Sequence, residues 1–221
     1  MTPIQADRPL SGNSLIFWRI AQSVTWLVGL WILITLWVNP PLGLHAFWNV
    51  LITLAPVIFV VSVGLWRNIC PLGTVALLPR HIGLSKMKRL SVNGQGILYL
   101  IAVIGLLLIL PLRQLIFNQN GWATSILIIV CCMAAVICGM LFDWKSAWCS
   151  GLCPIHPVEK LYGTKVAFHL SNAHCVSCKQ CVIPCPDSVG SSLELNKTVY
   201  HRVANQFLIG GFPGFIWGWF H

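Results

Sequence analysis

Four cysteines within eleven residues form the part of this sequence with the clearest chemistry. The spacing is Cys175-x2-Cys178-x2-Cys181-x3-Cys185, and Pro186 follows the last cysteine. Two-residue gaps allow one tight loop to wrap three thiolates around the corner of an iron–sulfur cube. A zinc site more often uses two ligand pairs far apart in sequence, and neighbouring Cys-x2-Cys thiols are poorly placed for a relaxed disulfide. The run therefore predicts at least one [4Fe–4S] cluster.

The remaining six cysteines divide into two groups by their surroundings. One group lies within a long apolar run, where free cysteines pack as small apolar residues; its members are Cys131, Cys132 and Cys138. The other group lies just past the ends of apolar runs and is a candidate ligand set for a redox cofactor; its members are Cys70, Cys149 and Cys153.

Two of the segments that follow apolar runs look like copies of one Cys-x3-Cys-Pro motif. The second copy is complete, with Cys149, Cys153 and Pro154. The first copy keeps Cys70 and its following proline, and has Trp66 in place of the first cysteine. Because each copy follows a pair of apolar runs, the pattern predicts an internal duplication of a two-helix unit.

The number of clusters stays open at the level of the sequence. A single cluster could use all four cysteines of the run, or three of them plus one thiol of the second group. Two clusters would need eight ligands, and seven thiols lie outside the apolar runs. In the two-cluster arrangement the fourth cysteine of a run, Cys185, belongs to the other cluster. The missing ligand would then be His156 or His174, or the cluster would have an open iron corner.

Most of the sequence is apolar. Hydrophobic residues make up 57% of the chain and charged residues only 9%, unlike a soluble globular protein. Arg19, one turn inside the first apolar run, can extend its charged end to the membrane interface. Four runs are long enough for a helix to cross a hydrocarbon core of roughly 30 Å; they are 15–38, 46–66, 96–112 and 122–142.

The predicted fold class is an all-α membrane protein with four transmembrane helices and a small cytoplasmic ferredoxin-like iron–sulfur module. Residues 1–143 would form the transmembrane domain, 144–205 the iron–sulfur module and 206–221 an apolar tail. The tail is too short and too broken by Pro213 and its glycines to span, which favours an interfacial or partner-docking segment. Because so small a module cannot build a large core, metal binding is expected to stabilise its fold.

Basic residues predict the orientation in the membrane. The connection 67–95 carries five of them and no acid, whereas the short connections on the other side carry only Arg113. The positive-inside rule then places this connection and both termini in the cytoplasm, where thiols stay reduced and available for metal. The net charge of +9 is concentrated beside the membrane. It favours anionic lipid headgroups or an acidic redox partner protein over nucleic acid.

Together, four apolar helices, Cys-Pro motifs after the second and fourth, and a cytoplasmic cysteine run resemble the membrane-bound ferredoxin-type proteins. This family includes the NapH-type quinol dehydrogenase component of periplasmic nitrate reduction, the MauN-type protein of methylamine utilisation and the larger NosR- and CcoG-like polyferredoxins. The resemblance covers nearly the whole chain and implies a multi-pass protein of the bacterial inner membrane. In the family the two Cys-x3-Cys-Pro motifs face the cytoplasm and are proposed to matter for electron transfer. This chain departs from the pattern, because it has one cysteine run instead of the usual two and its first motif is reduced to Cys70.

The leading interpretation is a [4Fe–4S] electron-transfer subunit that relays electrons between quinol or a redox partner and another oxidoreductase at the cytoplasmic face. No residue pattern for bond-making catalysis is evident, so a subunit is expected more than a self-sufficient enzyme. The alternatives are a maturation factor for another oxidoreductase and an accessory subunit whose cluster only stabilises docking. A quinone site would need polar groups at the bilayer, and the sequence does not locate one; the candidates are Gln22, Ser23, Thr25, Asn49, Thr53, Thr124 and Ser125.

Overall fold

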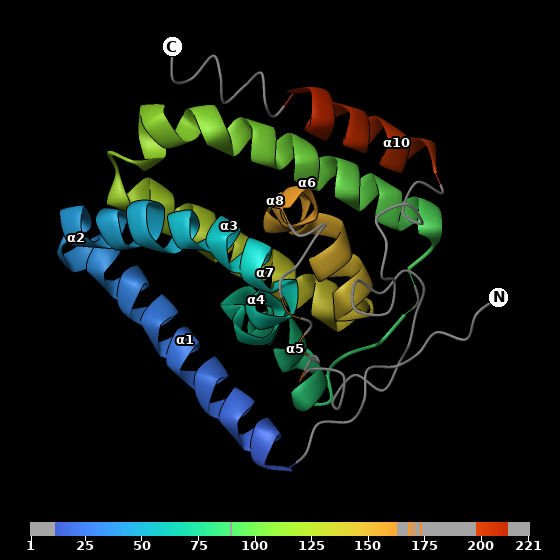
Figure 1. Cartoon of the computed structure of the whole chain (residues 1–221), viewed down its shortest axis with the longest axis horizontal. Coiled ribbons are helices and arrows are strands. Elements are labelled where there is room, and N and C mark those ends of the chain that lie inside the picture. Colours follow the sequence, from blue (N-terminus) through green and yellow to red (C-terminus); the bar gives the residue numbers. More distant parts are fainter. Residues whose placement is uncertain are drawn as a thin grey trace.

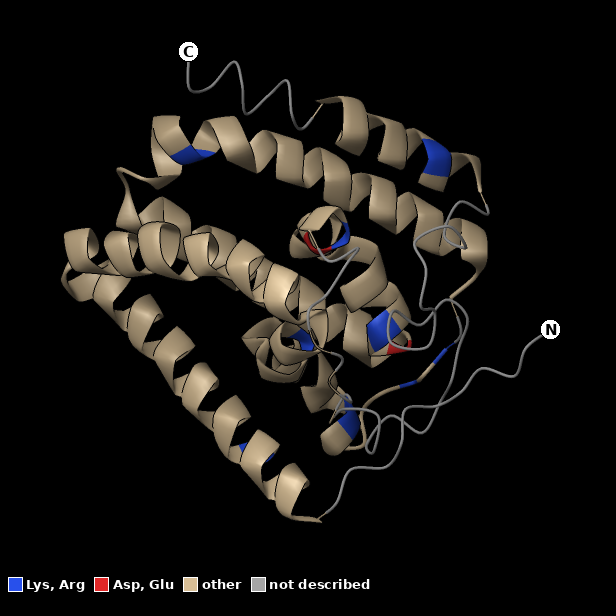
Figure 2. Ribbon diagram, viewed as in Figure 1, with Lys and Arg blue, Asp and Glu red and all other residues tan. Residues whose placement is uncertain are grey.

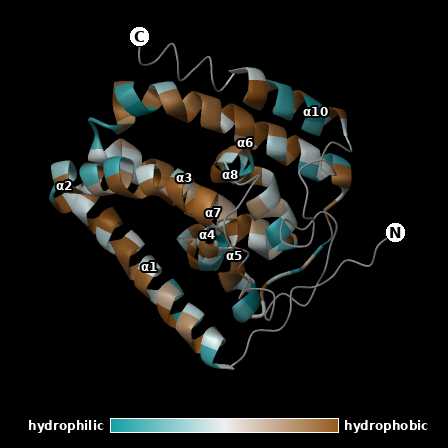
Figure 3. Cartoon of the chain, in the orientation of Figure 1, coloured by the Kyte–Doolittle hydropathy of each residue, from teal (hydrophilic) through white to brown (hydrophobic). Residues whose placement is uncertain are grey.

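The structure, a computed structural model, describes residues 12–88, 90–162, 168, 170, 173 and 198–211. These residues form helices and short connections, with one isolated β-bridge between Lys88 and Phe142. Four helical stretches among them are long and apolar enough to cross a membrane, and hydrophobic residues dominate these stretches in Figure 3. The prediction of an all-α chain with four membrane-length helices is therefore confirmed.

The helices follow one another along the chain as Figure 1 shows. Those labelled η are π-helical turns that continue or join the α-helices. The membrane-length stretches are α1, α2 through α3, α6 through η2, and α7. The elements are α1 (Gly12–Val38), α2 (Pro40–Leu44), η1 (His45–Leu51), α3 (Ile52–Val61), α4 (Val63–Ile69), α5 (Pro71–His81), α6 (Val92–Leu112), η2 (Arg113–Phe117), α7 (Gly121–Leu141), η3 (Lys145–Leu152), α8 (Ile155–Tyr162), α10 (Val199–Gln206) and η5 (Phe207–Gly211).

The second membrane-length stretch ends earlier than its sequence predicts. The apolar run 46–66 predicts a helix to residue 66, but the stretch ends at Val61, and Ser62 has an extended backbone with φ −163° and ψ 115°. The Ser62 hydroxyl then accepts a hydrogen bond from the backbone N–H of Leu65 and caps the short helix α4. Hydropathy does not detect this break because the residues on both sides of Ser62 are apolar.

Helix α4 turns back into the bundle instead of leaving it. The Gln22 side chain on α1 donates a hydrogen bond to the Asn68 carbonyl at 2.9 Å, and two turns further along α1 Gly29 lies against Pro71. Helix α4 therefore carries the turn at Cys70 to the depth of the middle of α1, and α5 then lies alongside α7.

The chain after α7 repeats this path. The Asp143 carboxylate accepts a hydrogen bond from the backbone N–H of Ser146 at 3.3 Å, the same spacing at which Ser62 caps α4. The next helix, η3, packs against α6. The chain then turns at Cys153 and Pro154 into α8, which packs against α3 and α6.

The two cysteine turns share one backbone conformation. The φ and ψ angles are −59° and 116° at Cys70 and −65° and 118° at Cys153, and each cysteine precedes a proline. The returning helices are exchanged between the halves, since α5 lies on α7 while α8 lies on α3. The structure therefore supports the predicted duplication. Each half adds to its helix pair a short inward helix, a Cys-Pro turn and a returning helix.

Close backbone contacts join three helices at the end of the bundle opposite the connection 82–91. Gly43 of α2 and Gly121 of α7 both lie against the backbone of α1 at Leu36, where a Cβ on either glycine would overlap main-chain atoms. Nearby, the Trp48 indole donates a hydrogen bond to the Thr124 hydroxyl at 3.1 Å, with both side chains buried. Small residues at such contacts are typical of helix packing in membranes.

Charged side chains are few and gather toward the end of the bundle that carries the connection 82–91 (Figure 2). Among the described basic residues, Arg113 alone lies at the opposite end, where it donates to the Trp48 carbonyl at 3.3 Å. The two described acidic residues are Asp143, after α7, and Glu159, on α8. This asymmetry of charge is the one on which the predicted orientation depends.

Replacing Gly139 tests the contact between α5 and α7. A Cβ at this position would overlap the Ala76 carbonyl oxygen, so the helices must move apart. We expect G139A to lower the stability of the purified protein by about 1–3 kcal/mol, measured by thermal unfolding in detergent. G105A on α6 is the matched control, because a Cβ there meets nothing within 4 Å. Equal stability of the two variants would contradict the contact.

Candidate metal centre

Each Cys-Pro turn holds its thiol at the start of a helix. The backbone N–H groups two and three residues after Cys70, at the start of α5, favour the charged form of its thiol, although the side chain makes no cap hydrogen bond there. The backbone N–H groups at the start of α8 favour the charged form of Cys153 in the same way. Backbone donors and the positive end of a helix dipole stabilise negative charge on sulfur, and hydrogen bonds to sulfur are among the features that tune iron–sulfur clusters. Both sulfurs are thus suited to be metal ligands.

Desolvation opposes a free thiolate at both turns. Burial raises the pKa of Cys70 and of Cys153 well above the usual range of a thiol, and the backbone donors offset only part of this effect. Both groups are therefore protonated thiols near neutral pH in the metal-free chain. A bound metal ion would displace these protons, as it does at other thiolate sites.

The two Cys-Pro turns lie near each other between the halves of the bundle. The charge of Cys70 contributes to the raised pKa of Cys153, and Ile155 packs against the apolar clusters that border both cysteines. Cys149 is partly buried and packs against the cluster that contains Cys153. The sequence placed these thiols just past helix ends, whereas the structure carries Cys70 inward because α4 turns back.

The chain leading to the cysteine run is tied to the end of α4. The backbone N–H of Ala173 donates a hydrogen bond to Oδ1 of Asn68 at 2.7 Å, and both residues are fully buried. Asn68 precedes Cys70 by two residues, and Ala173 precedes Cys175 by two. The predicted ligands of the run lie outside the described residues, as does His174; they are Cys175, Cys178, Cys181 and Cys185.

Within the described part of the chain, no group of three or more His, Cys, Asp or Glu side chains is arranged to hold a metal ion. His156, the other histidine considered as a ligand, is buried, and neither ring nitrogen hydrogen-bonds to a described residue. Its Nδ1 lies 3.8 Å from Oε2 of Glu159, beyond hydrogen-bonding distance. A complete metal site would therefore need ligands from outside the described residues.

A partly buried ion pair joins the inward helix of one half to the returning helix of the other. Arg67 on α4 donates from Nε to Oε1 of Glu159 on α8 at 2.7 Å, and its Nη2 contacts the same oxygen. Burial opposes the charge on Glu159, but Arg67 and His156 outweigh it and hold the pKa of the carboxyl below its usual value. The charge of Glu159 also raises the pKa of Cys70 and Cys153.

A second group of buried polar side chains surrounds Tyr99 on α6. The ring of His201 stacks on Tyr99 with centroids 5.8 Å apart, and the ring of His156 meets it edge-on at 5.9 Å. Lys160 lies over the same ring, with Nζ 4.2 Å from the centroid. One turn away, Gln95 is fully buried, and neither of its amide atoms has a hydrogen-bond partner among the described residues.

Sequence reasoning did not find the ion pair or the cluster around Tyr99. One signal was present, because Glu159 is the only acidic residue between positions 144 and 186. An isolated acid in a basic, membrane-adjacent segment indicates a specific partner. The cluster around Tyr99 left no such signal, since its members come from three helices that are far apart in sequence.

The polar residues that were quinone candidates all have hydrogen bonds within the bundle. Thr25 donates to the Ile69 carbonyl at 2.9 Å, which fastens α1 to α4. Thr124 donates to the Phe117 carbonyl at 2.7 Å. The others also bond to nearby groups; they are Gln22, Ser23, Asn49, Thr53 and Ser125. These side chains are therefore accounted for as structural contacts.

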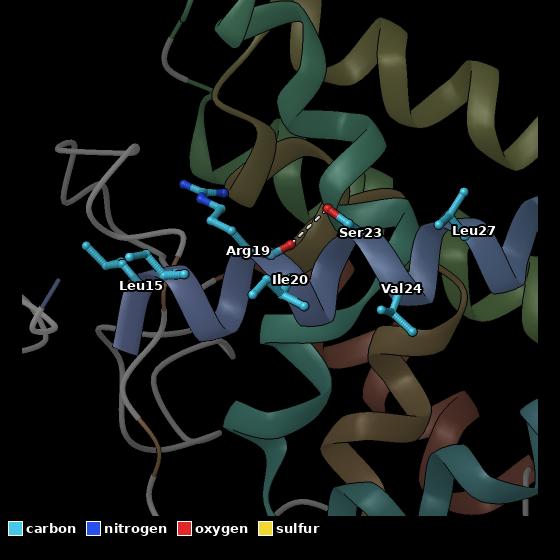
Figure 4. A pocket seen from close by; sticks show the side chains of 7 residues that line it. Leu15, Arg19, Ile20, Ser23, Val24 and Leu27 are labelled. Carbon is cyan, nitrogen blue, oxygen red and sulfur yellow. Dashed lines mark hydrogen bonds between the residues drawn. The ribbon is translucent and has the colours of Figure 1, made fainter. Parts of the chain in front are cut away.

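A shallow groove runs along the outer side of α1 (Figure 4). The only hydroxyl in it belongs to Ser23 and donates to the Arg19 carbonyl at 2.9 Å. Apart from Arg19, the rest of the lining is apolar and comes from the same helix, which is typical of a lipid-facing surface; the lining residues are Leu15, Ile16, Arg19, Ile20, Ser23, Val24 and Leu27.

Comparison of the chain with protein-family models, with curated proteins and with solved structures finds no significant match. Its function is therefore inferred from its residues and their geometry.

Removing the Asn68 side chain tests the tie to Ala173. N68A leaves the buried Ala173 N–H without its acceptor, which costs about 1–3 kcal/mol. We expect amide hydrogen exchange around residue 173, followed by mass spectrometry, to become more than about tenfold faster. N118A, at the opposite end of the bundle, is the control and should leave this exchange unchanged. Unchanged exchange in N68A would contradict the tie.

A double-mutant cycle tests the Arg67–Glu159 pair. R67M leaves a buried carboxylate unpaired and should lower the unfolding free energy by about 3 kcal/mol. Because E159Q removes that carboxylate, the double variant R67M/E159Q should be more stable than R67M alone. The folded-state pKa of Glu159 lies below its usual value of 4.5. The pair therefore stabilises the wild type fully above that pH, and its contribution is lost as the pH falls through the lowered pKa. Additive effects in thermal unfolding would exclude the coupling.

Proposed function

We propose that the chain is a membrane-anchored [4Fe–4S] electron-transfer subunit. It relays electrons between quinol or a redox partner protein and another oxidoreductase at the cytoplasmic face. The observation that carries the proposal is the hydrogen bond between Ala173 and Asn68. It joins the approach to the cysteine run to the region where Cys70 and Cys153 meet.

Covalent connectivity gives this observation its weight. Two residues of chain span at most about 7 Å, which bounds the distance from Ala173 to Cys175. The same limit holds between Asn68 and Cys70. Since Asn68 and Ala173 are in contact, Cys175 lies within roughly 20 Å of Cys70, a separation that permits one shared site for the first cysteine of the run and the thiols of the Cys-Pro turns.

The residues available at such a site fit an iron–sulfur cluster, which supplies one-electron chemistry when bound. Cys175, Cys178 and Cys181 would hold three corners, with the fourth ligand from Cys185 or from a Cys-Pro turn. The backbone donors at Cys70 and Cys153 would hydrogen-bond to ligand sulfurs and tune the potential. The apolar residues around both turns exclude water from the site.

The same features support membership of the membrane-bound ferredoxin-type family, in a bacterial inner membrane with both termini cytoplasmic. Lys86 and Lys88 are exposed on the connection 82–91. Their charge suits an acidic partner surface or anionic lipid headgroups on that side.

Metal analysis of the anaerobically purified protein tests the proposal. We expect about four irons and four sulfides per chain for one cluster, or about eight of each for two. C178S removes a core ligand and should abolish the iron content and the reduced-state EPR signal. C132S is the matched control, because Cys132 lies on α7 within the spanning stretch, and it should retain both. Stoichiometric zinc with no iron in the wild type would overturn the proposal.

The same measurements show whether the thiols of the Cys-Pro turns are cluster ligands. If Cys70 or Cys153 is a ligand, C70S or C153S should change the EPR line shape or lower the iron content. An unchanged spectrum and iron content in both variants would exclude Cys70 and Cys153 as ligands.

A further inference from the structure

The helix α10 and its continuation η5 form a segment of 13 residues that is packed against α6 along much of its length (Figure 1). The residue numbers at these contacts increase together along α6 and α10. Thr198 and His201 lie against Gly96, and the Tyr99 hydroxyl donates to Oδ1 of Asn205 at 3.0 Å. Helix α10 therefore runs parallel to α6 and starts at the end of the bundle that carries the connection 82–91.

The depth of this segment follows from its partners on α6. Ala204 and Leu208 are buried in one cluster with Tyr99, Val103 and Leu106. Leu106 lies 14 residues after the start of the spanning stretch Val92–Phe117 and is close to its middle. With a rise of about 1.5 Å per residue, α10 and η5 extend roughly 20 Å along α6. That is about two thirds of a hydrocarbon core.

Polar side chains of α10 face α6. His201 and Asn205 point to α6, where His201 is 1% exposed and its Nδ1 lies 2.7 Å from the Thr198 hydroxyl. On the outer side, α10 exposes Val199 together with the polar Arg202 and Gln206, whereas η5 exposes large apolar side chains, with exposed fractions of 54% at Phe207 and 68% at Ile209. In water the outer face of η5 would expose this apolar area, whereas lipid provides its preferred surroundings.

The outer surface of α6 is also apolar at this depth. Ile101, Ile104 and Leu108 are exposed along α6, and α6 belongs to a membrane-length stretch. The polar Arg202 on α10 lies one turn from the start of the helix, from where its long side chain reaches the interface, as predicted for Arg19 on α1.

We infer that α10 and η5 lie inside the hydrocarbon layer, with their apolar face against lipid acyl chains and their polar face closing the cluster around Tyr99. The sequence assigned residues up to 205 to a cytoplasmic module and the following tail to an interfacial or docking role. The parallel packing on α6 and the exposed apolar side chains of η5 place the segment deeper than that.

Depth-dependent quenching tests this inference. A fluorescent non-natural amino acid, excited apart from tryptophan, replaces Ile209 in the full-length protein in phosphatidylcholine and phosphatidylglycerol vesicles. We expect lipids with a nitroxide near the chain end to quench it more strongly than lipids with a nitroxide near the headgroup, and iodide in the water to have little effect. A second probe at Phe207 guards against failure of the first variant to fold.

Two reference positions calibrate the result. Ile104, exposed near the middle of α6, reports a deep lipid-facing site, and Ile82, exposed in the connection after α5, reports the water-facing end. Quenching at 209 that matches position 104 supports the inference. Quenching by iodide, as at position 82, would overturn it, and protection from both quenchers would overturn it as well, because a protein partner would then cover this face.

Discussion

The partly buried ion pair between Arg67 and Glu159 is the constraint on which the centre of this structure depends. It fastens the inward helix of the first half to the returning helix of the second. A carboxylate with 9% of its side chain exposed is tolerated there only because the guanidinium compensates its lost hydration. The pair therefore fixes the relative position of α4 and α8, and with them the two Cys-Pro turns.

Given that fixed geometry, the thiols acquire properties that a surface loop would not provide. Desolvation and the negative charge of Glu159 keep them protonated, while the backbone N–H groups at the helix starts favour the charged form of each thiol. Opposed influences of this kind make a thiol unreactive alone and receptive to a metal cation. The hydrogen bond from Ala173 brings the approach to the cysteine run into the same neighbourhood.

The long helices could be predicted because each is a nearly uninterrupted apolar run. Hydropathy detects such runs, as in the segments 15–38 and 122–142. The inward turn of α4 could not, because a single serine in an extended conformation breaks the helix within an apolar context. The Cys-Pro repeat did indicate a duplication, and the matching backbone angles of Cys70 and Cys153 agree with it. The exchange of returning helices between the halves, and the cluster around Tyr99, depend on tertiary contacts that no local pattern encodes.

Trp66 stands where the second half has Cys149, and this single difference makes the two halves chemically unequal. The Trp66 ring is buried and meets Phe59 edge-on, with centroids 5.3 Å apart, so the first half is filled by aromatic packing at the position where the second keeps a thiol. The two halves share an architecture but differ chemically, because the first has a packed aromatic ring where the second has a potential metal ligand. The two halves would therefore contribute unequally to any metal site between them, because the first Cys-Pro motif has one thiol and the second has two.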